Sequence, residues 1–359
     1  MQEELNLKSI LLRNKKEIDE IALSFLPVAN ESPEIQGLYD MMRDYPSRGG
    51  KGLRGTLCLL WCELFGGKRR DAMISAAGLE LFQNWILIHD DVEDASDIRR
   101  GLPTLHKKHG IELAINTGDA LHGKMWELLL RNEQVIGSSL TLEVLSEFGK
   151  MLDETTEGQQ MELTWNTRNV WDIGEKDYLL MVTKKSAWYT CISPARIGAI
   201  IGLGSVRSDD VFLLQKSKYL SALIDIGTDL GIAFQITDDV LNLIADEAKY
   251  GKEILGDIYE GKRTLMIIHL IQRADPESKR KLIEILSKNR QAKSKEDVLF
   301  VLEKMEEYGS IGYAKEIAQD HFRRAMSQFE ILMSQDRNPD RGSLETTRQV
   351  FDYMITREY

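Results

Sequence analysis

Cysteine, proline and histidine are scarce in this sequence, whose 359 residues include three cysteines, 7 prolines and 6 histidines. Three cysteines cannot build the disulfide framework of a small secreted domain. Cys58 and Cys62 lie four residues apart in an apolar stretch, where we interpret them as reduced core residues. The alternative is a metal-binding pair, but further ligands at suitable spacing are missing. We also find no Ser-His-Asp or Cys-His arrangement that would supply a protein nucleophile.

A basic stripe and a long apolar run are missing as well. The net charge of −11 and the absence of clustered basic residues exclude a nucleic-acid groove as the main function. No window reaches the roughly 18 consecutive apolar residues of a membrane span. The first 20 residues are charged and lack the apolar block of a signal peptide. We therefore expect a cytoplasmic protein with no integral membrane segment.

Helical periodicity dominates what is present. Apolar residues recur at i, i+3 and i+4 in eight ranges: 5–24, 53–66, 70–91, 119–132, 139–163, 176–202, 211–244 and 343–356. No alternating run bounded by turn residues predicts a sheet, and Pro46 and Pro103 are expected in loops. Residues 273–297 are polar and are expected at the surface. Since no linker divides the chain, we predict an all-α fold with a single domain over residues 1–359.

Two aspartate-rich runs, residues 87–101 and 234–243, each end an apolar helix. Asp90 and Asp94 are four residues apart, so both carboxylates project from one face of a helix. Asp238 and Asn242 have the same spacing. Mg²⁺ prefers oxygen ligands and is usually completed by waters and substrate phosphates. The runs therefore predict a ligand with an anionic head and an apolar tail; the alternative is two solvated acidic helix ends.

Basic residues accompany both runs. Arg99 and Arg100 follow the first run directly, and arginine binds phosphate oxygens in a bidentate manner. The remaining polar candidates are Lys51 and Arg54 in GGKGLRG, Gln83 on the helix before Asp90, and Lys185, Ser186, Lys252 and Lys262 farther along. Any one of them alone would be an ordinary surface residue. Together they predict sites for two diphosphates, one held by metals and one by cations alone.

These segments resemble the trans-isoprenyl diphosphate synthases, from about residue 48 to about residue 270. GGKGLRG is similar to the family's GGKxxRP, with Gly55 in place of proline. LIHDDVEDASDIRRGLPT and FQITDDVLNL resemble the family's two aspartate-rich motifs, the second with Asn242 in place of its last aspartate. EGQQMEL resembles the GQxxD helix, with Glu162 for aspartate, and KKSA resembles the KT motif, with Ser186 for threonine.

The resemblance implies a large helical bundle around a central cavity, acting as a homodimer, with residues 1–47 and 271–359 as peripheral helices of the same domain. It implies that three Mg²⁺ ions grip the allylic diphosphate through Asp90, Asp94 and Asp238. Nearby residues outside the direct ligands would be Asp91, Gln159, Glu162, Asp239 and Asn242. Cations assisting that grip would be Arg99, Lys185 and Lys252, with Lys262 also binding substrate. Isopentenyl diphosphate would be held by Lys51, Arg54, Gln83 and Arg100, while Ser186 and Gln235 would face the cationic carbons.

Product length is predicted from Trp85, five residues before Asp90 and so about 7.5 Å deeper along the same helix. Its indole would block the growing prenyl chain and so form the floor of the cavity. Phe82, one turn deeper, would form a second floor, and Ile86 is a smaller, non-aromatic neighbour of Trp85. The alternative is that Trp85 is an ordinary core residue. We expect a condensing enzyme that makes geranylgeranyl diphosphate, with a farnesyl diphosphate synthase as the alternative. More remote alternatives are a terpene cyclase and a non-catalytic subunit of a prenyl synthase.

Overall fold

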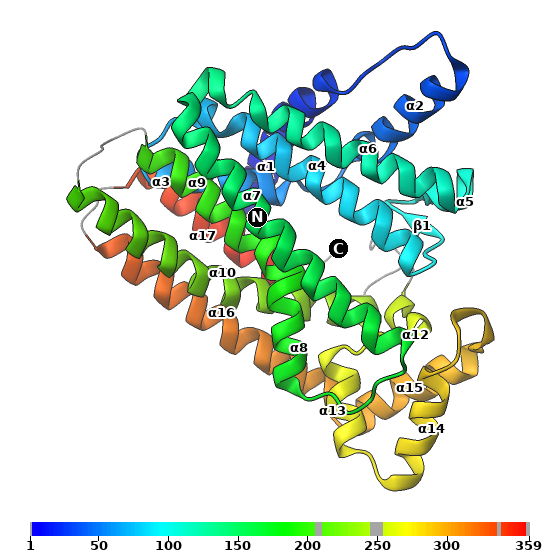
Figure 1. The fold of residues 1–359 in the computed structure, drawn as a ribbon. Helices are drawn as coiled ribbons and strands as arrows, with labels where there is room; N and C mark the ends of the chain where they lie inside the picture. The colour runs from blue at the N-terminus through cyan, green and yellow to red at the C-terminus, as the bar shows by residue number, and fades with distance from the viewer. Residues whose placement is uncertain (1, 205–209, 245–253, 336–338, 357–359) are drawn as a thin grey trace. The chain divides into compact units, whose positions relative to one another are not determined.

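Helices make up almost all of the described chain in the computed structural model (Figure 1). The structure describes residues 2–204, 210–244, 254–335 and 339–356. Its α-helices are α1 (Gln2–Phe25), α2 (Pro33–Ser47), α3 (Leu53–Leu64), α4 (Arg69–Glu93), α5 (Leu105–His109), α6 (Ile111–Leu130), α7 (Glu133–Thr167), α8 (Glu175–Val182), α9 (Ser193–Gly204), α10 (Asp210–Ile244), α12 (Gly256–Glu260), α13 (Leu265–Arg273), α14 (Pro276–Leu286), α15 (Lys295–Glu307), α16 (Ser310–Ser334) and α17 (Arg341–Thr356). A π-helix, η1 (Thr183–Ile192), and a 3-10 helix, η2 (Arg290–Ala292), complete the set, and the all-α fold class is confirmed.

Each of the eight predicted ranges overlaps a helix, but the structure departs from the expectations in several places. Residues 176–202 form α8, η1 and α9 instead of one α-helix, because the middle segment is π-helical. Pro46 lies inside α2, near its end, and the expectation that it marks a loop is wrong. A short hairpin joins α4 to α5, with β1 (Ile98–Arg99) antiparallel to β2 (Leu102–Pro103). The expected ranges also omit α2, α5, α12, α13, α15 and α16, and they begin α6 eight residues late.

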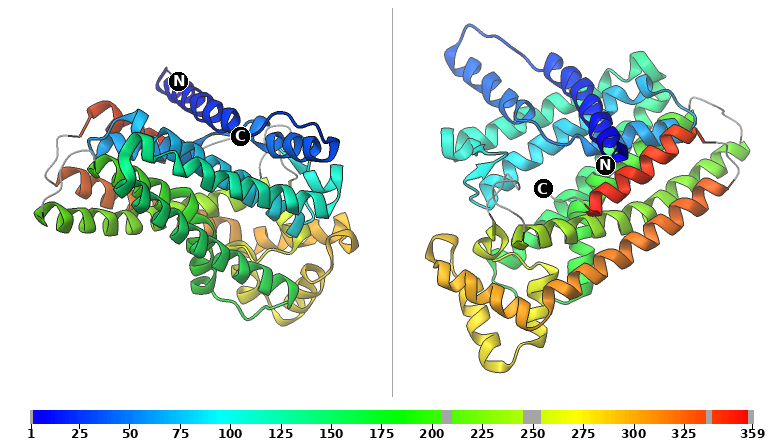
Figure 2. Two further views of the ribbon diagram at one scale, coloured as in Figure 1. Left: turned by 45° about the horizontal axis from the view of Figure 1, so that its top comes forward. Right: turned by 180° about the vertical axis from the view of Figure 1, so that it is seen from behind.

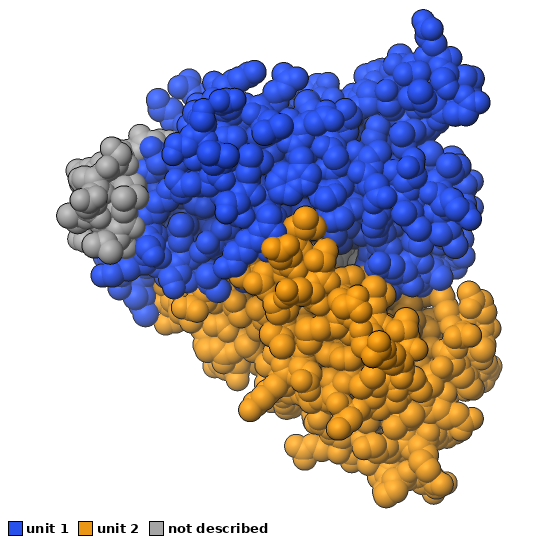
Figure 3. Space-filling view, in the orientation of Figure 1, with its two compact units in different colours: residues 1–151, 189–224, 331–352 blue, residues 152–188, 225–330, 353–359 orange. Residues whose placement is uncertain are grey.

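The chain divides into two compact units by its contacts (Figure 3). Unit 1 comprises residues 1–151, 189–224 and 331–352, and unit 2 comprises residues 152–188, 225–330 and 353–359. The helices α7 and α10 and the π-helix η1 each contribute residues to both units. A single domain over the whole chain stays a prediction.

In unit 1, α3 packs against α9 and α4 packs against α6 (Figures 1 and 2). The α3–α9 contact brings backbone against backbone, since a Cβ on Gly198 would lie 2.3 Å from the carbonyl oxygen of Cys58. Cys58, Cys62 and Cys191 are all buried and unbridged, in agreement with reduced core cysteines. Burial raises the pKa of the Cys62 thiol to about 12, which leaves it protonated at neutral pH.

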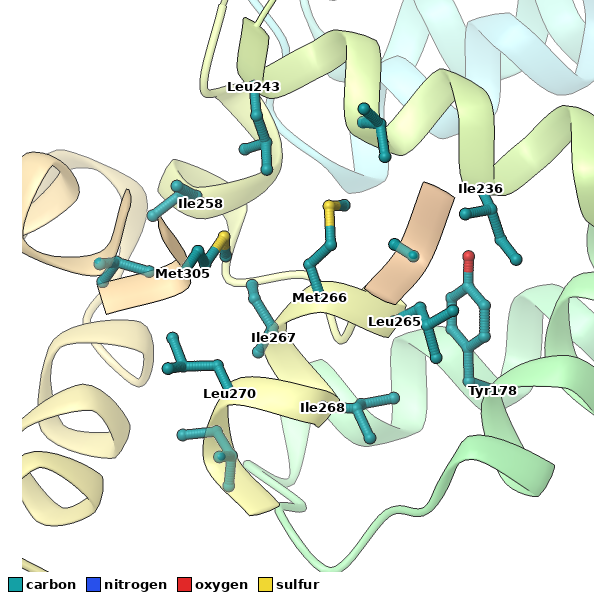
Figure 4. Close-up of a cluster of buried hydrophobic side chains, with 14 of the residues drawn as sticks. Tyr178, Ile236, Leu243, Ile258, Leu265, Met266, Ile267, Ile268, Leu270 and Met305 are labelled. Carbon is teal, nitrogen blue, oxygen red and sulfur yellow. The ribbon is translucent and has the colours of Figure 1, made fainter. Parts of the chain in front are cut away.

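In unit 2, an apolar cluster surrounds α13, which buries nearly its whole length (Figure 4). Figure 4 shows Tyr178 of α8 beside Leu265 of α13 and Ile236 of α10. The polar stretch 273–297 includes α14 and η2. Asp275 caps the N-terminus of α14, and its side chain accepts hydrogen bonds from two amides of the first turn. Leu282 and Leu286 are buried, so this helix has one apolar face.

One described stretch, Gln215–Ile244, is long and apolar enough to cross a membrane by length and composition alone, with a mean hydropathy of 1.2. The sequence-based expectation was that no stretch would qualify. This is weak evidence for a span, because core helices of globular proteins pass the same test and 44% of the window is buried inside the fold.

Candidate active site

The first aspartate motif ends α4 in unit 1 and divides its carboxylates between two environments. The amide of Asp94 donates to the carbonyl oxygen of Asp90 at 2.9 Å, so helical geometry persists and both side chains lie on one face. Both are partly exposed, whereas Asp91 is fully buried. Asp90 and Asp94 therefore remain accessible to a ligand, and Asp91 does not.

Asp91 binds two side chains: Tyr45, which is distant in sequence, and Arg99 of the hairpin that follows α4. Its carboxylate accepts a hydrogen bond from the Tyr45 hydroxyl at 2.5 Å and from Arg99 Nε at 2.9 Å, with Arg99 Nη2 as a further donor. Burial and the Asp91 charge raise the pKa of Tyr45, so the hydroxyl stays protonated. Burial opposes the charge on Arg99, but Asp91 outweighs it and the net pKa of Arg99 is raised. Arg99 also approaches Asp90, with Nη2 to Oδ2 at 3.6 Å.

Arg100 occupies the turn of the hairpin. Arg100 and Gly101 both have positive φ, 54° and 75°, as the two central residues of a type I′ turn require. The turn directs Arg100 Nη1 to the carbonyl oxygen of Tyr45 at 2.8 Å and to Asn84 Oδ1 at 3.3 Å. A Cβ on Gly50 would lie 3.3 Å from Arg100 Nη2, so the GGKG segment lies directly against this guanidinium.

Arg54 is buried in the first turn of α3. Its Nη2 donates to the Thr190 hydroxyl at 2.8 Å, and its guanidinium lies 4.3 Å from the centre of the Tyr189 ring. Its Nε is buried and has no hydrogen-bond partner among the described residues. Lys51 and Gln83 are partly exposed. Unit 1 thus contains four of the predicted diphosphate residues, Lys51, Arg54, Gln83 and Arg100, as well as Asp90 and Asp94.

Trp85 and Phe82 lie on the part of α4 that faces α6. The Trp85 ring stacks on His122 with centroids 4.0 Å apart and packs edge-on against Phe82 at 5.3 Å. His122 in turn accepts a hydrogen bond from Trp126 Nε1 at 2.9 Å. Trp85 Nε1 is buried without a partner among the described residues, and Ile86 is partly exposed. The packing makes Trp85 a rigid wall of α4, which suits both a chain-length floor and a core role.

In unit 2, η1 carries Lys185 and Ser186 and is closely approached by two helices. A Cβ on Gly158 of α7 would lie 2.2 Å from the amide nitrogen of Lys185, and one on Gly231 of α10 would lie 2.4 Å from the Ala187 Cβ. Only glycine permits either contact. π-Helical segments are often found at functional sites.

The same unit holds a continuous hydrogen-bond chain. Ser186 Oγ donates to Gln235 Oε1 at 2.8 Å, and Gln235 Nε2 donates to Asp239 Oδ1 at 2.8 Å. The Tyr178 hydroxyl donates to the other oxygen of Asp239 at 2.8 Å. Burial, together with the charge of Asp238, raises the pKa of Asp239 to about 7 against these hydrogen bonds. These hydrogen bonds fix the orientation of the Gln235 side chain. The neighbouring Asp238 is partly exposed.

The remaining predicted residues of unit 2 are engaged within the protein. Lys185 Nζ pairs with Glu162, and Lys262 Nζ lies 3.0 Å from Glu260. Asn242 Oδ1 accepts a hydrogen bond from the amide of Asp257 at 3.1 Å, which fixes the start of α12. Gln159 lies on α7, near Glu162 in sequence, and Lys252 lies outside the described residues.

The carboxylates of the candidate site suit a Mg²⁺ ion whose coordination is completed by substrate phosphates. Among the described residues there is no group of three His, Cys, Asp or Glu side chains that could hold a metal unaided. Mg²⁺ sites of this class use one or two carboxylates, several waters and substrate phosphates. Asp90 and Asp94 match that need because they are partly exposed and share a helix face. Asp238 offers a comparable carboxylate in unit 2.

Sequence reasoning missed the residues that hold the predicted ones in place. Tyr45, Thr190 and Tyr178 lie far along the chain from Asp91, Arg54 and Asp239, so no local pattern indicates them. Glu80 and Asn84 carry a signal that sequence reasoning could have used, because they are polar residues in an apolar helix and lie within about one turn of Gln83.

Comparisons with known proteins agree with the motifs. A family model described as polyprenyl synthetase matches residues 35–305, which extends beyond the segment expected from the sequence. The chain is 34% identical over 311 residues to a geranylgeranyl diphosphate synthase of Sulfolobus acidocaldarius, covering 87% of this chain and 89% of the relative. It is also 34% identical to a short chain isoprenyl diphosphate synthase of Methanothermobacter thermautotrophicus, covering 87% of each.

Among solved structures, the geranylgeranyl pyrophosphate synthetase of Pyrococcus horikoshii superposes with a TM-score of 0.84 at 32% identity, covering 99% of this chain and 100% of that one. The family match, the two relatives and this structure all concern prenyl synthases. The chain therefore belongs to the polyprenyl synthetase family and is a trans-prenyltransferase of isoprenoid biosynthesis.

Proposed function

We propose that the chain condenses isopentenyl diphosphate with an allylic diphosphate and makes geranylgeranyl diphosphate. The observation that carries this proposal is the buried cation set of unit 1, in which the Arg54 Nε donor has no partner among the described residues. A buried, unpaired charged donor is costly, and an anionic oxygen from a ligand would satisfy it. Arg100 belongs to the same set. Burial is the main cause that lowers the pKa of Arg100, and the nearby Arg54 charge lowers it further.

In this proposal Arg54, Arg100, Lys51 and Gln83 hold isopentenyl diphosphate without metal. By the family resemblance, Asp90 and Asp94 in unit 1, and Asp238 in unit 2, would each offer a carboxylate to Mg²⁺, and bound Mg²⁺ would bind the allylic diphosphate. When bound, Mg²⁺ would neutralise the charge that develops on the departing diphosphate. The number of ions, three by family resemblance, belongs to the proposal.

The reaction itself needs no protein nucleophile. The allylic C–O bond breaks, the isopentenyl double bond attacks the resulting cation to form a C–C bond, and a proton leaves to a base, for which the released diphosphate is suited. Ser186 and the Gln235 carbonyl oxygen, oriented by Asp239, would face the cationic carbons. Lys185, now paired with Glu162, would turn toward the allylic diphosphate, and Glu162 with Gln159 would orient metal-bound water. Lys252 and Lys262 would assist the same diphosphate, and Arg99 would do so from its place between Asp90 and Asp91.

Product length rests on Trp85 and Phe82 as floors for a chain anchored at Asp90. Five residues of helix separate Trp85 from Asp90, or about 7.5 Å. The rigid stack of Trp85 on His122 supports a fixed floor, and Ile86 leaves room on one side. The names of the relatives support a twenty-carbon product, with farnesyl diphosphate as the alternative.

We further propose a cytoplasmic homodimer. Apolar side chains of α6 and of the start of α7 are exposed in the single chain, and a second copy of the chain would cover them: Ile111, Leu113, Ile115, Leu130, Val135 and Leu142. Three buried, unbridged cysteines are in keeping with a reducing compartment. Light scattering of the purified chain would test the dimer, and a monomer at assay concentration would contradict it.

Mass analysis of products tests the function. The purified chain is incubated with Mg²⁺, isopentenyl diphosphate and each of dimethylallyl, geranyl or farnesyl diphosphate, and the expected main product has twenty carbons. Turnover of an allylic diphosphate without isopentenyl diphosphate would indicate a terpene cyclase. No turnover by the chain alone would favour the non-catalytic subunit, and a fifteen-carbon end product would favour farnesyl diphosphate synthase.

A further inference from the structure

Glu80 is a carboxylate buried in the middle of α4, only 8% exposed. Its Oε1 accepts a hydrogen bond at 3.1 Å from the amide of Gly55, the third residue of α3. The residue before α3, Gly52, has no side chain that could cap the helix. Glu80 therefore supplies from another helix both the acceptor and the negative charge that a helix N-terminus favours.

The Glu80 charge acts on two cations, Lys15 and Arg100. Burial lowers the pKa of Lys15 and of Arg100, and Glu80 is the charge that most opposes this effect at both residues. Arg100 is further destabilised by the neighbouring charges of Arg99, Arg54 and Arg48. Asp91, the other buried carboxylate of this region, is engaged by Arg99 and Tyr45. Glu80 is thus the main counter-charge for Arg100.

The backbone of Glu80 takes part as well. Asn84 Nδ2 donates to the carbonyl oxygen of Glu80 at 2.8 Å, which orients the Asn84 amide so that its Oδ1 accepts from Arg100. On the opposite side, a Cβ on Gly52 would meet the Lys15 Cβ at 2.9 Å, so the glycine segment is enclosed between α1 and the Arg100 side chain.

We propose that Glu80 is a positioning residue for the metal-free diphosphate. Its carboxylate fixes the first turn of α3, which carries Arg54, and holds Arg100 in place before substrate arrives. This inference rests on the proposed assignment of that cation set to isopentenyl diphosphate. Glu80 contacts no substrate itself; it acts through the amide of Gly55 and through the charge of Arg100.

The experiment compares Glu80→Gln, which keeps an acceptor for Gly55 but removes the charge, with Glu80→Asp, which keeps the charge. Glu147→Gln is the matched control, because Glu147 is also buried in unit 1 and pairs with Arg196 at 2.7 Å, an ion pair to which we assign no substrate role. Calorimetry measures the affinity for isopentenyl diphosphate in EDTA, and steady-state assays measure KM for each substrate. Circular dichroism and urea denaturation measure folding of every variant.

We expect Glu80→Gln to weaken isopentenyl diphosphate binding about tenfold, the effect of losing one charge contact of about 1.4 kcal/mol. The KM for the allylic substrate should change less than about twofold, and kcat at saturation should stay near wild type. Glu80→Asp keeps the charge on a side chain that is one methylene shorter, so it should lose measurably less affinity than Glu80→Gln but more than the wild type, and Glu147→Gln should lose stability with unchanged affinity.

Unchanged affinity in a folded Glu80→Gln variant would overturn the inference, as would equal weakening toward both substrates. A loss of affinity in Glu80→Asp with none in Glu80→Gln, which keeps the acceptor for the Gly55 amide, would assign Glu80 to helix capping alone and would also overturn it. If Glu80→Gln does not fold, the comparison of Glu80→Asp with Glu147→Gln decides: a selective loss of isopentenyl diphosphate affinity supports the inference, and none overturns it. Wild-type protein that neither binds nor turns over isopentenyl diphosphate would instead refute the proposed function.

Discussion

Substitutions of the adjacent carboxylates Asp90 and Asp91 are expected to affect different properties: Asp91→Asn should lower stability, and Asp90→Ala should lower turnover. Asp91→Asn keeps the volume of the side chain and an acceptor for the Tyr45 hydroxyl, but it removes the charge opposite Arg99. Both Asp91 and Arg99 are buried. Removing one partner of a buried ion pair leaves the other uncompensated and typically costs about 3–5 kcal/mol. We therefore expect Asp91→Asn to be strongly destabilised.

Asp90→Ala should instead abolish turnover and spare the fold. Asp90 is partly exposed, and its Oδ2 is 3.6 Å from Arg99 Nη2, a distance at which such pairs contribute about 0–1 kcal/mol. Asp90 lies in the last turn of α4, where a carboxylate opposes the helix dipole by about 0.3–1 kcal/mol. These two effects nearly cancel. Loss of a metal ligand should reduce turnover at least about 100-fold, or ~2.7 kcal/mol of barrier.

Urea denaturation and product formation measured on the same preparations separate the two effects. The denaturation midpoint of Asp91→Asn should fall well below that of the wild type, while Asp90→Ala should stay close to it with little activity. Asp238→Ala in unit 2 is expected to behave like Asp90→Ala. A stable Asp91→Asn, or near-normal turnover in Asp90→Ala, would refute the division of labour within this motif.

Four further predictions follow from the geometry. Trp85→Ala should lengthen the product by at least one five-carbon unit at a stability cost of about 3–5 kcal/mol, and unchanged product length by mass analysis in a folded, active variant would place the floor elsewhere. Arg100→Lys should raise the KM for isopentenyl diphosphate more than that for the allylic substrate, since a point charge replaces a fork; equal effects would contradict the assignment. Burial lowers the pKa of His122, so its contribution to stability is present above its unfolded pKa near 6.5 and is lost as the pH falls below that value; a denaturation midpoint with the same pH dependence in His122→Gln would contradict this. Gly158→Ala should reduce stability and kcat by forcing η1 away from α7, whereas Gly149→Ala on the same helix, with open space around it, should gain up to ~1 kcal/mol; equal denaturation midpoints would refute the close-approach argument.

Much of this arrangement could be predicted because it is local. The four-residue spacing of Asp90 and Asp94 requires only a helix, and helical periodicity located α4 within two residues at either end. Partners such as Tyr45 for Asp91 could not be predicted, since they depend on how distant helices pack. Sequence reasoning could place Asp91 near the metals but could not show that its carboxylate is fully committed to Arg99 and Tyr45.

The π-helix illustrates a different limit. Residues 183–192 have the composition of an ordinary helix, and the π-helix lies where Gly158 and Gly231 of neighbouring helices pack closely against it, which a local pattern cannot reveal. The hairpin after α4 escaped prediction for a similar reason. Each strand is only two residues long, and its turn places Arg100 at a positive φ that sequence statistics disfavour.

The cation set of unit 1 is more easily understood as a site prepared for an anion than as a means of stabilising the fold. The chain has a net charge of −11, yet Lys15, Arg54, Arg99 and Arg100 gather where burial lowers the pKa of Lys15 and Arg100. Two buried carboxylates, Asp91 and Glu80, offset part of this charge. A diphosphate that binds only the folded chain would offset more, and at 100 times its dissociation constant it would add about 2.7 kcal/mol of stability. In the proposed assignment, substrate binding and stability are therefore coupled through the same residues, and a bound diphosphate would relieve an unfavourable charge distribution in the fold.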